Sequence, residues 1–182
     1  SDPCGGTPFS PDARQPNVVC RVVDGKAVWV YPGNLVTTPD DPVIIVDDVL
    51  IEGDLNTDGG FTIRVTRDGS IPMVNVTGCV DINGNVEIDM SELSDDDIKK
   101  LEKTNGRSSV VMESSCDLSS FTSNFETKNV KKGCRKVTTE VQSQTSSETG
   151  RSQLSMLFKV NSGQCNVWWI VLISVLGGVL IL

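Results

Sequence analysis

The sequence predicts an all-β fold with one short helix, and an α+β fold is the alternative class. Short runs rich in Val and Ile recur through residues 18–90, and such residues favour strands. Turn-forming pairs, among them Asp24-Gly25, Asp68-Gly69 and Asn83-Gly84, separate these runs. A spacing of about ten residues between turns is typical of a β-sandwich or a short β-solenoid.

The chain opens with a Pro- and Gly-rich arm over residues 1–20. Proline blocks early helix formation, so we expect an extended segment here. Asp24-Gly25 then stands between residues 18–23 and 26–31, both of which are largely apolar. A two-residue Asp-Gly loop between two such runs predicts a β-hairpin.

A loose internal repeat follows the hairpin. Residues 47–65 and 74–90 each consist of an apolar run, a Gly- or Asn-containing turn and a second apolar run. Two stacked turns of a solenoid would produce this repetition, because each turn buries its apolar face on the next. A sandwich with ordinary meanders remains the other interpretation.

A helix of about residues 95–103 interrupts the strands. Ser94 and Asp97 have the spacing of a capping box. Acidic residues begin the segment and lysines end it, which suits the helix dipole. Asn105-Gly106 provides the stop signal. Strands are expected to resume at residues 109–115, 137–142 and 154–160, with an exposed polar loop over residues 143–151.

Six cysteines and no histidine indicate disulfides rather than a zinc site. The even count and wide spacing are typical of an oxidising compartment. We expect Cys4–Cys20 to pair, because these two residues flank the Pro-rich arm. Asn75-Val76-Thr77 is an acceptor for N-linked sugar and agrees with secretion. The disulfide candidates are Cys4, Cys20, Cys79, Cys116, Cys134 and Cys165.

The charge of the chain argues against a nucleic-acid partner. The net charge is −8, and residues 1–100 carry 18 acidic and 7 basic side chains. This larger, acidic part would repel phosphate. We expect a protein or glycan ligand, and self-association is a further expectation.

The sequence contains little that suggests chemistry. Without histidine, a Ser-His-Asp or Cys-His site is excluded, and we expect no enzyme. Asp54, Asn56 and Asp58, followed by Gly59, resemble the first half of an EF-hand calcium loop. Val65 stands where the bidentate Glu of such a loop belongs. Weak calcium binding is one interpretation, and a turn between strands is the other; no other cofactor is expected.

Residues 167–182 form an apolar run that predicts a membrane anchor over residues 164–182. Trp168 and Trp169 begin the run, as interfacial aromatics do. A spanning helix contacting the lipid bilayer is one interpretation. A lipid-attachment (GPI) signal is another, with the cleavage site among Asn161, Ser162 and Gly163. A tail-anchored protein facing the cytosol is the third.

These observations predict three regions. Residues 1–20 are a disulfide-pinned arm, residues 21–163 a β-rich extracellular domain and residues 164–182 the anchor. We therefore expect a non-catalytic glycoprotein of the cell surface that acts in adhesion or recognition, or as a structural coat. A weak calcium-binding adhesion module is the alternative.

Overall fold

The computed structural model describes residues 4–103, 107–128 and 131–161. Strands make up 49% of the chain and helices 10%, so the structure is mostly β and fits the predicted all-β class or its α+β alternative. The predicted helix is also confirmed as α1 (Asp95–Lys103), in which the Asp97 N–H donates to the Ser94 hydroxyl at 3.2 Å. A 3₁₀ helix, η1 (Ser119–Asn124), was not predicted.

The strands before α1 are β1 (Val19–Val23), β2 (Lys26–Tyr31), β3 (Leu35–Thr37), β4 (Val43–Ile45), β5 (Val49–Ile51), β6 (Leu55–Asp58), β7 (Phe61–Arg64), β8 (Val74–Val76), β9 (Val80–Asn83) and β10 (Val86–Asp89). Those after it are β11 (Arg107–Ser114), β12 (Phe125–Lys128), β13 (Lys131–Lys132), β14 (Arg135–Thr145) and β15 (Ser152–Asn161).

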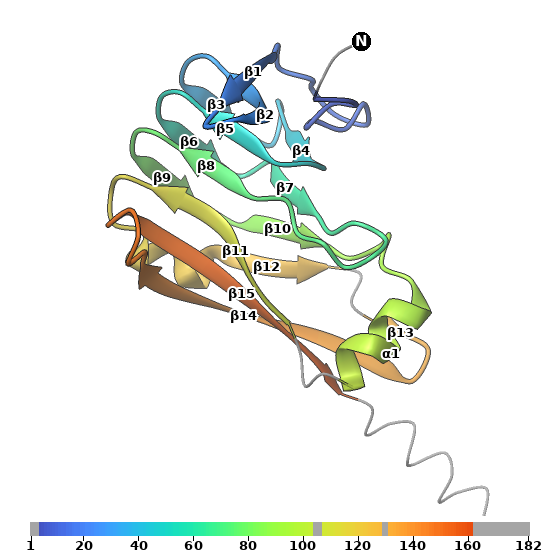
Figure 1. Cartoon of the computed structure of the whole chain (residues 1–182). Helices are drawn as coiled ribbons and strands as arrows, with labels where there is room; N and C mark the ends of the chain where they lie inside the picture. The colour runs from blue at the N-terminus through green and yellow to red at the C-terminus, as the bar shows by residue number, and fades with distance from the viewer. Residues whose placement is uncertain (1–3, 104–106, 129–130, 162–182) are drawn as a thin grey trace, which may run out of the picture.

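The chain winds as a coil of stacked turns (Figure 1). Each of the first three turns contributes one strand to each of three parallel ladders: β2–β5–β8, β3–β6–β9 and β4–β7–β10. A fourth turn adds β11 and β12, with η1 between them. Of the two predicted architectures, these parallel ladders match the solenoid, because a sandwich is built of antiparallel sheets.

The internal repeat corresponds to the second and third turns. Val49 pairs with Val74, Leu55 with Val80 and Phe61 with Val86. All six side chains are buried, and equivalent positions therefore stack on one another inside the coil. Burial of such apolar columns is the main stabilising term for stacked turns.

The corners of the coil are held by glycines in close contact. A Cβ on Gly78 would lie 2.0 Å from Asp54 Oδ1 and 2.7 Å from the Gly53 carbonyl oxygen. The Gly78 N–H in fact donates to that carbonyl at 2.9 Å. The corner between β8 and β9 therefore has room only for glycine.

Both ends of the coil are covered. At the first turn the N-terminal arm crosses the core, where Phe9 is fully buried and bridges Ile45. At the last turn the β14–β15 hairpin continues the large sheet from β11 and buries Leu154, Met156 and Phe158. Helix α1 covers the same end with Ile98 and Leu101.

The three strands predicted after α1 are present with slightly different bounds, whereas β12 and β13 were not predicted. A further correction concerns residues 143–151, because β14 extends to Thr145 and the connecting turn is shorter than expected. Asn161 is the last residue of β15. The predicted anchor at 164–182, with Cys165, Trp168 and Trp169, lies outside the described residues, as do Ser162 and Gly163. Within the described part of the chain, no helix is long and apolar enough to cross a membrane.

Candidate functional site: a cleft along the open edge of β2

The candidate site begins with the β1–β2 hairpin. Asp24 and Gly25 both have positive φ, 51° and 79°, as a two-residue hairpin loop requires. Five residue pairs join β1 to β2, from Val19 opposite Val30 to Val23 opposite Lys26. The hairpin predicted from the sequence is therefore confirmed.

The other edge of β2 is mostly open. Strand β5 pairs only with Val30 and Tyr31, the last two residues of β2. In a two-residue hairpin the pair flanking the loop is hydrogen-bonded, and bonded and non-bonded pairs then alternate. The backbone N–H and C=O of Ala27 therefore point away from β1, and the described ladder gives them no partner. Tyr31 lies four residues after Ala27 on β2, so its backbone groups also point away from β1. Its carbonyl indeed accepts from the Glu52 N–H, beyond β5, at 2.9 Å.

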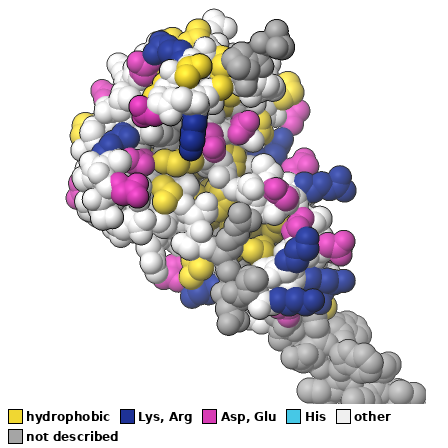
Figure 2. All heavy atoms as spheres, in the orientation of Figure 1, with side chains coloured by type: hydrophobic (Ala, Val, Ile, Leu, Met, Phe, Trp, Pro, Cys, Tyr) yellow, Lys and Arg dark blue, Asp and Glu magenta, His cyan; other side chains and the backbone are white. Residues whose placement is uncertain are grey.

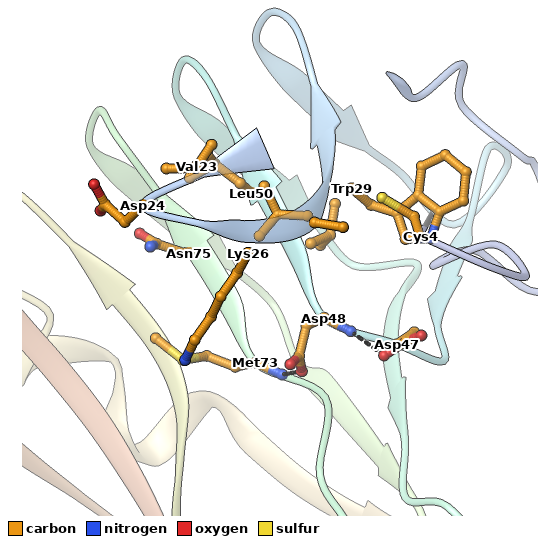
Figure 3. A pocket seen from close by; sticks show the side chains of 13 residues that line it. Cys4, Val23, Asp24, Lys26, Trp29, Asp47, Asp48, Leu50, Met73 and Asn75 are labelled. Atoms are coloured by element: carbon orange, nitrogen blue, oxygen red, sulfur yellow. Dashed lines mark hydrogen bonds between the residues drawn. The ribbon is translucent and has the colours of Figure 1, made fainter. Parts of the chain in front are cut away.

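A cleft of about 760 Å³ follows this open edge (Figure 3). Lys26 and Val28 line it from one face of β2, and Ala27 and Trp29 from the other. Successive side chains of a strand point to opposite faces. The cleft therefore runs along the backbone edge of β2 rather than across one face of the sheet.

The cleft is apolar along one side and charged at its ends. Val28, Leu50 and Met73 supply apolar surface from three successive turns of the coil. Figure 3 shows Lys26 extending from β2 toward Met73. The remaining charged side chains are acidic, namely Asp24 at the hairpin loop and Asp47 and Asp48 before β5.

Backbone hydrogen bonds fix both acids that precede β5. Asp47 Oδ1 accepts from the Asp48 N–H, and Asp48 Oδ1 accepts from the Met73 N–H, each at 2.8 Å. Both residues are solvent-exposed. Their carboxylates are therefore held in place while remaining accessible to a ligand.

Asn75, the predicted sugar acceptor, lies at the border of this cleft. Its Oδ1 accepts from Arg151 Nη1 at 2.7 Å. N-linked sugar attaches to the amide nitrogen, so this bond to the oxygen is compatible with glycosylation. Glycosylation of Asn75 stays a prediction, and its place beside the cleft could not be read from the sequence.

Arg151 belongs to a polar network on the outer face of the large sheet. It contacts Glu113 Oε1 at 3.3 Å and donates to the Val76 carbonyl. Gln153 Nε2 donates to the other oxygen of Glu113 at 3.2 Å. Glu113 is buried, with only 6% of its surface exposed to solvent. Sequence reasoning missed this network, because it placed Arg151 in an exposed polar loop.

The predicted calcium ligands lie on or beside a strand rather than around a loop. Asp54 Oδ1 accepts from the Cys79 N–H at 2.8 Å, and the Asp54 N–H donates to Asn34 Oδ1 at the same distance. Asp54 therefore joins three successive turns at one corner. Asn56 and Asp58 are exposed positions of β6. Among the described residues, no group of three or more His, Cys, Asp or Glu side chains is placed to hold a metal ion.

The structure contains the predicted disulfide Cys4–Cys20 and a second one, Cys79–Cys116. The first ties the N-terminal arm to β1, and Cys4 also lines the cleft. The second joins the β8–β9 corner to the segment after β11. None of the described cysteines is free.

The resolved pKa shifts belong to exposed groups outside the cleft. The Thr66 hydroxyl and then the Ser70 backbone N–H lower the pKa of Asp68 to about 2. Hydrogen bonds from Ser119 lower the pKa of Asp117. The ion-paired Glu87 carboxylate raises the pKa of Lys128. Lys159 lowers the pKa of Glu140. None of these shifts points to an acid–base pair.

The surface charge is distributed as the sequence indicates. Figure 2 shows Lys and Arg side chains gathered at the end that carries α1, with acidic side chains spread over the rest of this face. Lys99, Lys100, Lys103 and Lys136 are exposed residues of α1 and β14. Strand β2 lies at the opposite end of the coil (Figure 1), and the cleft along its edge is lined by residues 4–75, in the acidic part of the chain.

No protein-family model, curated protein or solved structure matches this chain.

Proposed function

We propose that this chain is a non-catalytic ectodomain of the cell surface that recognises a partner through the β2 cleft. The cleft is the observation that carries the proposal. It combines apolar surface from Val28, Leu50 and Met73 with accessible charge and an open backbone edge. Specific sites of this kind bind through a few apolar anchors and well-placed polar groups.

The disulfides support an extracellular location. Bonds such as Cys4–Cys20 and Cys79–Cys116 persist in oxidising compartments. The predicted anchor at 164–182 would hold the described domain at a membrane, with the cleft at the far end of the coil. Glycosylation of Asn75 belongs to the same proposal.

Recognition is favoured over a self-stacking coat by the covered ends of the coil. Open solenoid ends present unpaired apolar turns on which another copy can stack. Here the arm with Phe9 covers the core at β4 in the first turn, and the β14–β15 hairpin covers the last turn at β11. End-to-end stacking would require one of these covers to be displaced.

The proposal is tested with the full chain expressed in eukaryotic cells. Labelling of intact cells with a membrane-impermeant amine reagent should modify the chain. Cells displaying it should adhere to each other or to a second cell type. Leu50→Arg, in the cleft, should reduce adhesion strongly, whereas Val36→Arg should not. Val36 is a suitable control because it is 52% exposed on the separate strand β3.

Two outcomes would overturn the proposal. Absence of labelling on intact cells would contradict the surface location. Equal adhesion by both variants and by the unmodified chain would contradict a role for the cleft.

A further inference from the structure

We infer that the cleft takes an extended peptide segment of a partner protein, carrying a Lys or Arg, which adds to β2 as a strand. The inference rests on the proposed function and names the chemistry of the partner. Three properties of the cleft lead to it: the direction of the backbone groups of β2, the length of the open edge and the excess of acidic side chains.

The first property is the open edge itself. Ala27 lies in a non-hydrogen-bonded pair with Val22, so its N–H and C=O face the cleft. Ala27 is exposed, and side chains from both faces of β2 line the opening. A ligand there meets a backbone edge, and an extended peptide is the ligand that supplies matching N–H and C=O groups at strand spacing.

The second property is the length of the edge. Residues 26–28 of β2 precede the ladder with β5, because Val30 bonds to β1 and its pairing with Leu50 therefore uses the backbone of the neighbouring Trp29. Three residues at about 3.3 Å each give roughly 10 Å of unpaired strand. This edge accommodates a short linear segment, and Leu50 and Met73 provide apolar surface beside it.

The third property is charge. Asp24 lies at the hairpin end of the cleft, and Asp47 and Asp48 lie where β5 begins; among the described residues that line the cleft, Lys26 is the one cationic side chain. A basic side chain of the peptide would reach an acid at either end. An acidic peptide would instead meet three carboxylates, and like charges in an interface are strongly unfavourable.

The outer edge of β1 is the competing place for a strand to add. Strand β1 is the terminal strand of the eight-stranded sheet. It exposes Val22, whose backbone N–H and C=O face outward because the 22/27 pair is non-hydrogen-bonded. That edge lacks the cleft and its acids, and the inference therefore assigns the ligand to β2.

The experiment pans a phage-displayed library of random linear heptapeptides on the purified full chain in mild detergent. We expect enrichment of sequences that contain Lys or Arg among apolar residues. Synthetic peptides of the enriched sequence are then measured against variants. Ala27→Pro removes the cleft-facing N–H yet keeps the ladder to β1, because proline is tolerated where its nitrogen faces away from a partner strand. Loss of one or two hydrogen bonds should weaken binding about tenfold or more.

Val22→Pro is the matched control, because it makes the same change at the opposite member of the same pair. It should leave peptide affinity unchanged. Asp48→Asn should weaken binding of the basic peptide and reduce its dependence on salt, since Asn retains the acceptor for the Met73 N–H.

N-methylation of the peptide gives a second measurement that does not depend on the folding of a variant. A peptide bound as a strand donates alternate N–H groups to β2. Methylation should therefore weaken binding at every second position and not at those between.

Several results would overturn the inference. In the panning, these are the failure to enrich any linear peptide and the enrichment of an acidic consensus. In the affinity measurements, they are loss of binding in Val22→Pro but not in Ala27→Pro, and N-methylation effects that do not alternate along the peptide. Self-association that competes with the peptide would also overturn it by assigning the site to a second copy. In each case adhesion that Leu50→Arg abolishes would leave the proposed recognition function standing.

Discussion

Replacing Arg151 by Ala should destabilise the domain by about 2–3 kcal/mol. Removing one partner of a buried ion pair costs about 3–5 kcal/mol, because the other charge is left uncompensated. The Arg151 side chain is 25% exposed and that of Glu113 9% exposed, so we expect the low end of this range or slightly less. The lost bonds to Asn75 and Val76 act in the same direction.

The assay is urea unfolding with the disulfides intact, followed by far-UV circular dichroism. Lys159→Ala is the matched control, because Lys159 pairs with Glu140 at 3.1 Å but the two side chains are 58% and 51% exposed. An exposed pair contributes about 0.5 kcal/mol or less. The Glu113→Gln/Arg151→Ala double variant should recover part of the loss, since the uncompensated carboxylate is removed.

Equal stability of Arg151→Ala and Lys159→Ala would refute this reasoning. It would mean that water replaces the guanidinium without cost, and hence that the outer face of the large sheet is open beside Asn75. A double variant less stable than Arg151→Ala would also contradict the assignment of the loss to an unpaired Glu113.

The other predictions concern single residues. Gly78→Ala should lower the free energy of unfolding by about 2–4 kcal/mol through contact with the Gly53 carbonyl and Asp54; unchanged thermal stability would contradict the tight corner. The pKa of Asp68 should be about 2, below the usual aspartate value of 3.8. Because this pKa is depressed in the folded state, its contribution to stability is present above pH 3.8 and is lost as the pH falls through about 2. Carboxyl NMR shifts would measure it, and a normal pKa would remove the Thr66 hydrogen bond as a cause. Millimolar calcium should leave the melting temperature unchanged, because Asp54 already accepts the Cys79 N–H; a rise that Asn56→Ala abolishes would restore the calcium assignment. Asn75→Gln should remove one glycan by mass and increase affinity for the heptapeptide, since the sugar would stand at the border of the cleft; an unchanged mass would show that the acceptor is not used.

Local signals in the sequence predicted the elements that depend on local chemistry. The Asp24-Gly25 hairpin follows from the need for positive φ at both loop positions. Helix α1 follows from the Ser94 cap and its flanking charges. The internal repeat was visible because equivalent apolar residues recur at a fixed spacing.

The corners of the coil were not visible in the same way. Residues 49–55 appear in the sequence as part of one apolar run, yet the structure divides them between β5 and β6 with Gly53 at the corner. Alternation of apolar and polar residues continues through the bend, because the inside of the coil remains on the same side of the chain. A hydrophobic pattern therefore records which side chains are buried but not where the chain changes sheet.

The candidate site was beyond prediction for a different reason. An open edge is defined by where pairing stops, and the ladder between β2 and β5 stops after two residues. No single residue signals this. The Arg151–Glu113 contact joins positions 38 residues apart in the sequence. The residues around Arg151 in the polar loop do not indicate which distant acid it contacts.

The number of stacked turns also determines the length of the coil along its axis. Neighbouring strands in a sheet are about 4.8 Å apart, so each turn adds one fixed increment between the end that carries the β14–β15 hairpin and the end that carries β2 (Figure 1). The equivalent registers of β5 with β8 and β6 with β9 mean that a duplicated turn would fit the ladder without altering its neighbours. An additional turn between the third and fourth turns would therefore move the cleft by one strand spacing and leave its lining residues, which belong to the first three turns, intact.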